Sequence, residues 1–517
     1  MRVSSALNYL LPGGLLLLIT ACATVPQDFE QIASVAWSEP GQTTLGQFFD
    51  PPVTNDPSLS GVFLLDDPRT AFRARVYLAS LAEKTLDLQY YLWKGDTTGR
   101  LLLHRALQAA DRGVKVRMLI DDIYHSDRDA NYAAIDAHPN IQVRLFNPIG
   151  NRKAGRKLNF VFNKRELNNR MHNKIFLADS AVAVLGGRNI GDDYFGVDAE
   201  LNFRDLDVLT VGPAALEAGA AYDLYWNSKN AVPIGVLRQA PAEPAELGVL
   251  RNELDRSLQD RGAMPFTVAV SIEDVQEELQ SLRQQMTWAK VEVIVDPLER
   301  FEGGSESVFV SLGSKLTSGV QHELVLQSAY LIPTRKGIEN MASLTARGVR
   351  VRALTNSMQS NNHLSVHAHY MKYRQAMIEA GMELYEFRAD ASLLEFLHKN
   401  DAMASDSHSG LHTKAAVLDG RVTLVGSYNM DPRSRELNSE IGLLIHSEEF
   451  AARVLQAMDV DFDPSNSYRV TLNGEGNLRW TGASASGPVE FKNDPGASIW
   501  KRMIAAFIRL IPIEGEL

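Results

Sequence analysis

The hydrophobic positions of this chain alternate between a helical and a strand-like spacing. Apolar residues recur at helical spacing over 72–82, and an apolar run rich in aromatic residues follows over 86–93. A helical stretch over 99–112 then precedes two further apolar runs, at 114–120 and 141–146. Helices that alternate with short apolar strands are typical of a layered α/β fold. We therefore expect a sheet flanked by helices.

The second half of the chain repeats this order. An apolar run over 323–327 precedes a helical stretch over 337–347, and residues 347–354 echo the pattern of 112–119. Gly348 follows Gly113 by 235 positions, and the two histidines described below are 240 positions apart. A nearly constant offset indicates an internal duplication. The expected organisation is a first domain at 56–230, a linker or insertion without a counterpart or assigned chemistry at 231–304, a second domain at 305–480, and a tail at 481–517.

Two predicted strands carry the same polar pattern, H-x-K-x-x-x-x-D. The first pattern begins at His172 and the second at His412, each followed two positions later by a lysine, Lys174 or Lys414. Alternate residues of a strand share a face, so each histidine should point the same way as its lysine. Burying such a pair is costly unless it has partners or a function. One copy could be a satisfied core histidine, but two matched copies indicate a functional site.

The residues after each copy match as well. The motif aspartates, Asp179 and Asp419, each separate two apolar runs, and Asp-Gly in the second copy is a strong hairpin signal. Although these aspartates are part of the candidate site motif, we rate a role as turn formers above direct catalysis. Four more candidates for a supporting or phosphate-binding role follow the motifs, namely Asn189, Asn429, Asp205 and Glu440.

These residue types suit the cleavage of a phosphodiester. A neutral imidazole can act as the nucleophile, and a second imidazolium can protonate the leaving oxygen. Lysines and amides would stabilise the charged phosphate oxygens, and each carboxylate could hold one imidazole in the required tautomer. This chemistry requires neither a metal nor another cofactor.

The paired motifs resemble those of the phospholipase D superfamily. The segments 168–174, 350–357 and 426–434 are similar to those of bacterial cardiolipin synthases, particularly the C type. The resemblance implies two phospholipase D-like α/β domains, with mixed sheets flanked by helices, related by a pseudo-twofold axis. It also implies a ping-pong reaction through a phosphohistidine. By analogy the covalent bond is placed on His172 and the acid on His412, although the symmetry of the sequence does not decide between them.

Charge and cysteine content bear on location and partners. The net charge of −11 disfavours a general nucleic-acid binder, so no nucleic-acid partner is expected. The only cysteine, Cys22, follows an apolar run over 9–19 and the sequence Leu-Ile-Thr-Ala. This pattern resembles a bacterial lipobox, whereas the alternative is an ordinary secretory signal. We expect a signal peptide at 1–21, lipidation of Cys22, and a tether at 22–55. With Ala23 next, the resemblance implies an outer-membrane lipoprotein facing the periplasm.

Three further groups of residues have competing interpretations. The basic residues before the first motif form either a solvated face or a collector of anionic headgroups; they are Arg152, Lys153, Arg156, Lys157, Lys164, Arg165 and Arg170. The stretch 499–511 is an amphipathic basic helix, which we expect at a membrane interface rather than docked on the core. His363, His367 and His369 lack acidic neighbours in sequence, which favours a pocket-lining or surface role over metal binding.

Asp121 and Asp122 resemble a catalytic pair at the end of a strand. Their counterparts in the second half are Asn356 and Ser357, which argues against an essential pair of carboxylates. A role in capping the next segment or in lining the cleft is therefore favoured.

Two related reactions and two other function classes are compatible with these residues. The first hypothesis is a phosphatidyltransferase that makes cardiolipin from phospholipids such as phosphatidylglycerol and phosphatidylethanolamine. The second is a phospholipase D that uses water and releases phosphatidic acid. A nuclease or a non-catalytic lipid-binding lipoprotein is disfavoured, because the charge and the tail point to lipid and both motif copies are intact.

Overall fold

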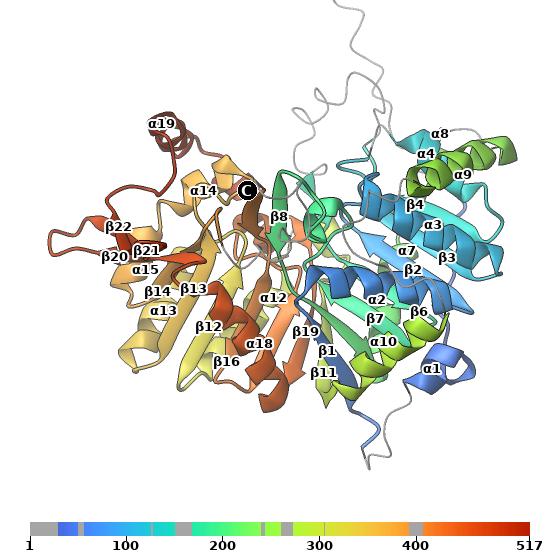
Figure 1. Ribbon diagram of the computed structural model, residues 1–517, viewed down its shortest axis with the longest axis horizontal. Helices are drawn as coiled ribbons and strands as arrows, with labels where there is room; N and C mark the ends of the chain where they lie inside the picture. Colours follow the sequence, from blue (N-terminus) through green and yellow to red (C-terminus); the bar gives the residue numbers. More distant parts are fainter. Residues whose placement is uncertain are drawn as a thin grey trace, which may run out of the picture.

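The computed structural model describes residues 29–49, 56–125, 128–149, 168–238, 243–259, 272–303, 305–391 and 407–517. The signal peptide, Cys22 and the basic residues at 152–165 lie outside these ranges. Figure 1 shows two halves side by side, each a sheet with helices against it. The α/β class and the duplication expected from the sequence are confirmed.

The first half alternates strands and helices before a run of antiparallel strands. Its elements are β1 (Ser60–Leu65), α2 (Pro68–Leu81), β2 (Thr85–Tyr90), α3 (Thr97–Asp111), β3 (Lys115–Asp121), α4 (Asp129–Asp136), β4 (Ile141–Phe146), β5 (Arg170–Met171), β6 (Ile175–Ala178), β7 (Val182–Gly186), β8 (Leu201–Arg204), β9 (Asp207–Val211), α7 (Pro213–Trp226) and β10 (Ala231–Pro233).

The second half repeats that order. Its elements are β11 (Thr287–Val295), α12 (Val308–Ser318), β12 (Glu323–Ser328), α13 (Arg335–Ala346), β13 (Arg350–Asn356), α14 (Leu364–Tyr370), α15 (Arg374–Glu379), β14 (Glu383–Phe387), β15 (His408–Leu411), β16 (Lys414–Leu418), β17 (Val422–Gly426), α17 (Pro432–Glu436), β18 (Asn438–Ser439), β19 (Ile441–His446), α18 (Glu448–Asp461) and β20 (Ser467–Leu472).

The two sheets are joined by strand pairing. The first runs β10-β4-β3-β2-β6-β7-β9-β1, and the second runs β11-β19-β17-β16-β12-β13-β14-β20. β1 pairs antiparallel with β11, with Gly61 opposite Trp288. In addition, α7 of the first half and α18 of the second contribute to one shared apolar core. The halves therefore form a single body.

The segment 231–304 differs from the expected insertion. β10 belongs to the first sheet, and β11 occupies in the second sheet the place that β1 has in the first, beside its last long antiparallel strand. The expectation that this segment has no counterpart is therefore wrong for β11. The other parts, α9 (Pro244–Gln259) and α10 (Ile272–Gln284), bury Leu254 and Leu279 against the first half.

The described part of the expected tether, residues 29–49, packs against the first half. Its backbone N–H groups at Ser34 and Ala36 donate to Asn227 and Asp223 of α7 and the turn after it. Farther on, α1 (Thr44–Phe48) buries Leu45. These contacts place this stretch within the first half, whereas a tether was expected up to residue 55.

The end of the chain returns to the middle of the molecule. β21 (Leu478–Ser484) and β22 (Gly487–Phe491) extend the second sheet, and α19 (Ile499–Ile508) projects beyond it (Figure 1). The last residues then reach α17, where the Arg433 N–H donates to the Leu517 carbonyl at 2.7 Å. The C-terminus therefore lies between the halves.

Candidate active site

Two small parallel sheets cross from one half to the other and position both motif histidines. β5, which precedes His172, pairs with β18 of the second half, and β15, which precedes His412, pairs with β8 of the first. The His172 N–H donates to the Ser439 carbonyl at 2.9 Å, and the His412 N–H donates to the Arg204 carbonyl at 2.7 Å. The motif therefore lies at the break between two strands, and not within one regular strand as its spacing predicted.

This crossing pairs each histidine with an acid of the opposite half. His172 Nδ1 lies 2.8 Å from Glu440 Oε2, and His412 Nδ1 lies 2.6 Å from Asp205 Oδ2. Both carboxylates are fully buried, and each histidine is only 6% exposed. An imidazole held through Nδ1 reacts through Nε2, and the carboxylate stabilises the imidazolium. The two halves thus supply two histidine–carboxylate pairs to one buried site.

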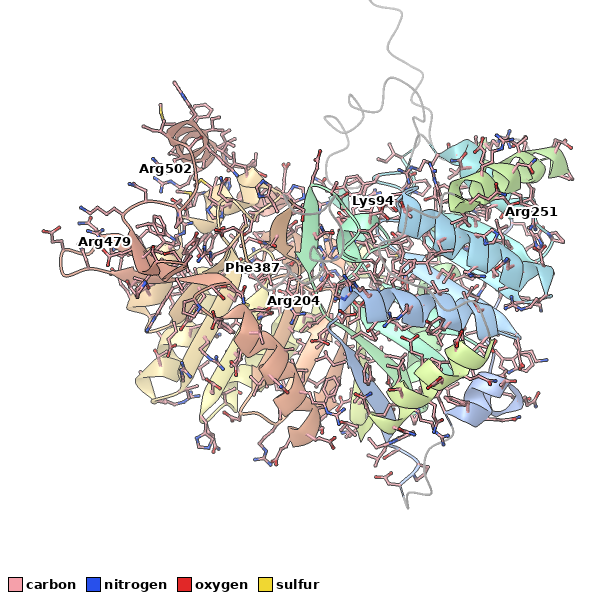
Figure 2. The ribbon with its side chains drawn as sticks, viewed as in Figure 1. Lys94, Arg204, Arg251, Phe387, Arg479 and Arg502 are labelled. Carbon is pink, nitrogen blue, oxygen red and sulfur yellow. The ribbon has the colours of Figure 1, made fainter. Side chains whose placement is uncertain are left out.

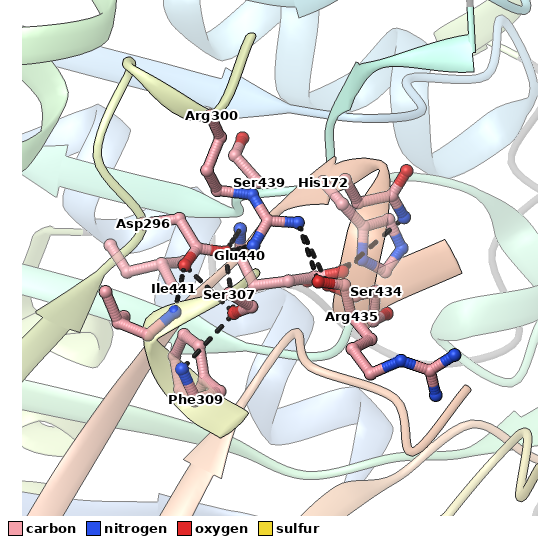
Figure 3. A network of polar contacts seen from close by, with 12 residues as sticks. His172, Asp296, Arg300, Ser307, Phe309, Ser434, Arg435, Ser439, Glu440 and Ile441 are labelled. Carbon is pink, nitrogen blue, oxygen red and sulfur yellow. Dashed lines mark hydrogen bonds and ion pairs between the residues drawn. The ribbon is translucent and has the colours of Figure 1, made fainter. Parts of the chain in front are cut away.

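The surroundings of Glu440 fix its position (Figure 3). Its carboxylate accepts a hydrogen bond from the Ser427 hydroxyl, and its backbone N–H donates to Asp296 at 3.0 Å. Asp296 in turn accepts from the Ser307 hydroxyl at 2.9 Å and lies near Arg300. Asp296 follows β11, in the segment to which the sequence assigned no chemistry. Only the tertiary structure brings it to the site.

Asp205 is positioned differently, because Gly187 stands where the second half has Ser427. A Cβ on Gly187 would lie 2.3 Å from Asp205 Oδ1. The carboxylate therefore approaches the backbone closely, and only glycine permits this approach. The shorter acid and the glycine fit each other, as the longer Glu440 fits Ser427.

The motif lysines lie beside the histidines and are almost fully buried. The Nζ of Lys174 donates to the carbonyl of His172, and the Nζ of Lys414 donates to that of His412. Burial lowers the pKa of Lys174 to about 7 and that of Lys414 to about 8, although nearby carboxylates act in the opposite direction. The positive charges available to a phosphate group therefore depend on pH near neutrality.

The histidines are held in the neutral form. Burial and the neighbouring lysines lower the pKa of both His172 and His412. Burial raises the pKa of Glu440 to about 7, whereas His412 and Lys414 outweigh burial and lower the pKa of Asp205. A neutral histidine is ready to act as a nucleophile. A bound phosphate anion would raise the pKa of the other histidine and favour its protonation.

We expect activity to fall on the alkaline side, because the lysines lose their charge as pH rises through about 7 to 8. The loss should appear in KM, since phosphate attraction weakens. Lys174→Arg and Lys414→Arg should keep their charge to higher pH and move the alkaline limb upward, even if their maximal rates are lower. Steady-state kinetics from pH 6 to 10 would measure this, and an alkaline limb that stays in place in both variants would contradict it.

Aromatic rings that the sequence did not single out flank both histidines. Tyr91 packs edge-on against His172 with ring centroids 4.9 Å apart, and Lys174 Nζ lies 5.5 Å from the same ring. Tyr194 packs against His412 at 5.2 Å and accepts a hydrogen bond from Asn189 Nδ2 at 2.9 Å. Tyr91 belongs to the aromatic run over 86–93 of the sequence. Its place in the site became apparent only from the position of His172 in the structure.

The asparagines after the motifs lie close to these groups. Asn189 is engaged with Tyr194, and the backbone N–H of Asn429 donates to the Ser434 hydroxyl at 3.2 Å. Both side chains are buried. Their donation to phosphate oxygens stays a prediction, and Asn189 orients the tyrosine beside His412.

The motif aspartates lie at the far ends of β6 and β16 from the histidines. Asp179 accepts backbone N–H groups of Glu83, Lys84 and Thr85, and Asp419 accepts those of 321–323 in the same way. Both aspartates have a positive φ, near +50°, as tight turns require. This geometry fits turn formers that anchor the start of β2 and β12. It also places the two aspartates away from the motif histidines.

The remaining candidates have structural contacts. Asp121 accepts the Met171 N–H at 2.8 Å, and Asn356 accepts the Leu411 N–H at 2.8 Å, so each holds the strand before a motif histidine. Asp121 also pairs with Arg170 at 3.2 Å, the one described member of the basic group. Asp122 accepts the Ile149 N–H at 2.8 Å.

Two of the three histidines around α14 do not have the expected pocket-lining or surface role. His367 and His369 are fully buried. His367 Nε2 lies 2.8 Å from Arg374, and His369 Nε2 lies 3.1 Å from the Ile511 carbonyl. His363 packs against Tyr330. Among the described residues, no group of three or more His, Cys, Asp or Glu has the arrangement of a metal site.

The chain is similar to proteins of a known family. The family described as cardiolipin synthase, PLD-like domain, matches residues 77–212 and 315–462. The chain is 34% identical to cardiolipin synthase C of Escherichia coli K12, over 90% of this chain and 98% of that protein. It is 29% identical to an uncharacterized protein of Helicobacter pylori J99, over 93% of this chain and 94% of that one.

A solved structure has the same fold. The phosphatidylserine synthase of Haemophilus influenzae Rd KW20 aligns with a TM-score of 0.56 at 15% identity, covering 89% of this chain and 98% of that one. The duplicated domains, the crossed histidine–carboxylate pairs and the sequence matches lead to one assignment. The chain belongs to the cardiolipin synthase family with phospholipase D-like domains.

Proposed function

We propose that this protein is a phosphatidyltransferase that makes cardiolipin by joining two phospholipids. The observation that carries the proposal is the crossed pairing of His172 with Glu440 and of His412 with Asp205 in one buried site. Such a site contains both a nucleophile and an acid–base group. The named relative from Escherichia coli supports the choice of reaction.

In the first step, Nε2 of His172 attacks the phosphorus of a donor phospholipid. The bond between phosphorus and the headgroup oxygen breaks, and His412 gives its proton to that oxygen, so the headgroup alcohol leaves. Glu440 stabilises the positive charge on His172. The lysines stabilise the phosphate oxygens. The product of this step is a phosphatidyl group bound covalently to His172.

In the second step, His412 takes the proton of a phosphatidylglycerol hydroxyl, whose oxygen attacks the phosphorus. The bond between phosphorus and His172 breaks, cardiolipin leaves, and both histidines return to their starting states. Water in place of the lipid alcohol would give phosphatidic acid instead. The acceptor that reaches the site therefore decides between a synthase and a phospholipase D.

Product analysis tests this reaction. Purified protein is incubated with vesicles of phosphatidylethanolamine and phosphatidylglycerol, and the lipids are identified by mass spectrometry. We expect cardiolipin together with the released headgroup alcohol. Phosphatidic acid as the only new lipid would contradict transfer and support hydrolysis, and a His172→Ala preparation controls for contaminating enzymes.

The location is part of the proposal. None of the helices in the described ranges has the length and apolar character that a membrane crossing requires. We propose that lipidation of Cys22 anchors the protein to the outer membrane, facing the periplasm, as its sequence context indicates. Mass spectrometry of the mature N-terminal peptide checks the acyl chains, and a Cys22→Ala chain recovered in the membrane fraction to the same extent would contradict the anchor.

Helix α19 supports contact with a lipid surface. Trp500 is 70% exposed and Leu510 just after the helix 76%, and Met503, Ile504 and Phe507 are also exposed. Lys501, Arg502 and Arg509 lie among these apolar residues, and Figure 2 places Arg502 on the projecting helix. Exposed aromatic and aliphatic side chains next to cations are typical of an interfacial helix that binds anionic lipids.

Trp500→Glu combined with Phe507→Glu should lower the rate on vesicles by about tenfold or more, because two large side chains would no longer enter the bilayer. The rate on a short-chain phospholipid below its micelle concentration should not change. Val249→Glu, at an exposed position of α9, is the matched control. Equal losses on both substrates would contradict the interfacial role. Point variants are preferable to deletion of 496–517, which would also remove the contacts around Arg433.

A further inference from the structure

A large apolar cavity lies beside the catalytic centre in the second half. It has a volume of about 530 Å³ and lies between α12 and α13 over the sheet. Leu324, Ile338, Met341, Met377 and Leu424 are among its apolar lining residues. This volume falls within the range of about 300–1,000 Å³ typical of ligand pockets. Among the described residues, nothing assigned above uses this space.

Smaller side chains at matched positions create the cavity. The strand registers align the halves: Leu88 faces Phe176 in the first sheet, and Leu326 faces Ala416 in the second. Phe176 is buried in the first half, whereas Ala416 lines the cavity. Each half also has an isolated β-bridge outside its long strands. These bridges match Trp93 in the first half to the cavity residue Leu331 in the second.

On the helix that faces the sheet, the reduction in side-chain size is larger. Asp179 binds the backbone at 83–85 and Asp419 binds it at 321–323, which fixes an offset of 238 and places Gly313 at the position of Arg75. Arg75 is buried, pairs with Asp207 at 2.8 Å and contacts the Tyr90 hydroxyl at 3.2 Å.

The partners of Arg75 are missing from the second half as well. Its strand registers place Gly442 at the position of Asp207 and Ser328 at that of Tyr90. A Cβ on Gly313 would meet nothing within 4 Å. A buried polar cluster that fills the first half is thus replaced by open apolar space in the second.

One end of the cavity reaches the catalytic groups. Lys414, Gly426 and Asp431 belong to its lining, and Lys414 is the lysine bonded to the carbonyl of His412. Lys336 and Arg435 also line it, which places cations near an apolar space. A ligand that fills the cavity and reaches the histidines must therefore combine a long apolar part with an anionic group.

We propose that this cavity holds one acyl chain of the phospholipid whose phosphate reacts at His172. The inference rests on the proposed function, because it places that phosphate beside Lys414. Chain binding in one half makes the nearly symmetric site asymmetric. A donor held by its chain in the second half presents its phosphorus in one orientation, which gives the two histidines different roles.

Filling the cavity tests this proposal. Gly313→Phe and Ala416→Phe return side-chain volume to the space, and Gly313→Ala is the matched control with little added volume. We expect both Phe variants to raise KM for a dioleoyl donor by about tenfold or more, since losing contact with two methylenes has an effect of this size. KM for a dihexanoyl donor, whose short chains fill less of the space, should stay near its wild-type value.

A direct measurement accompanies the kinetics. A phosphatidylglycerol with a photoreactive diazirine near the end of one acyl chain should crosslink to peptides that contain 308–318 or 335–346, and Gly313→Phe should abolish this. Crosslinks confined to other peptides would overturn the proposal, as would a dioleoyl-to-dihexanoyl KM ratio that stays unchanged in both Phe variants. If the wild-type product is phosphatidic acid, transfer is refuted but the acyl site still stands or falls by these measurements.

Discussion

Replacing His172 with alanine is expected to lower turnover by about 10⁴-fold or more, because the variant lacks the atom that bonds to phosphorus in the proposed mechanism. His412→Ala should cause a loss of similar size with an ordinary phospholipid, because the headgroup would have to leave without a proton. Initial rates on vesicles of phosphatidylethanolamine and phosphatidylglycerol measure both. Turnover that survives in both variants would contradict a phosphohistidine mechanism.

A donor with a nitrophenyl leaving group separates the two roles, since nitrophenolate needs no proton to leave. With this donor, His412→Ala should form a covalent adduct on His172 and then stall, because no base activates the acceptor. His172→Ala should form none. Mass spectrometry of the peptide that contains His172 detects the adduct. An adduct on His412 in the His172→Ala variant would reverse the assignment.

Replacing the two acids should separate the roles of the two histidines in the same way, and it tests the crossed pairing. Glu440→Gln and Asp205→Asn should each lower turnover by about 10³- to 10⁴-fold, because an amide neither stabilises the imidazolium nor fixes its tautomer. With the nitrophenyl donor, Glu440→Gln should slow the burst of nitrophenolate, since its partner His172 is the proposed nucleophile. Asp205→Asn should leave the burst fast and slow only the later turnover.

The opposite pattern would mean that each acid serves the histidine of its own half. Both acids are buried, so thermal unfolding of each variant must accompany the kinetics. A variant that melts near the wild-type temperature and still loses activity has lost chemistry and not the fold. Ser427→Ala, which removes a hydrogen bond to Glu440 but keeps its charge, should give a smaller loss than Glu440→Gln.

The proposed acyl-chain site would give the two halves different roles. Two identical half-sites would bind a donor equally well in either orientation, and each histidine would serve as nucleophile half of the time. The Arg75–Asp207 pair fills one half, and Gly313 opens the other. The two halves therefore differ in packing around the site, while the histidine and lysine of each motif are duplicated.

The local pattern of the sequence determined much of this protein. The alternation of helices and strands predicted the α/β class, and the repeated H-x-K-x-x-x-x-D spacing predicted the duplication. The turn role of Asp179 and Asp419 followed from their places between apolar runs, and their backbone contacts fit it. The mismatch of Asp121 with Asn356 argued against a carboxylate pair. These features are local, so residue spacing is enough to predict them.

Only the tertiary structure decided which groups meet. His172 bonds to Glu440, 268 positions away, and His412 bonds to Asp205, 207 positions away, because strands from opposite halves pair in parallel. Tyr194 reaches His412 for the same reason, whereas Asp296 meets Glu440, and the cavity meets Lys414, through packing within the second half. A strand's own sequence sets which face is apolar, but its partner is chosen by the packing of both halves around their shared core. The sequence thus predicted the candidate reacting residues, and the packing determined how they are paired and which half holds the apolar cavity.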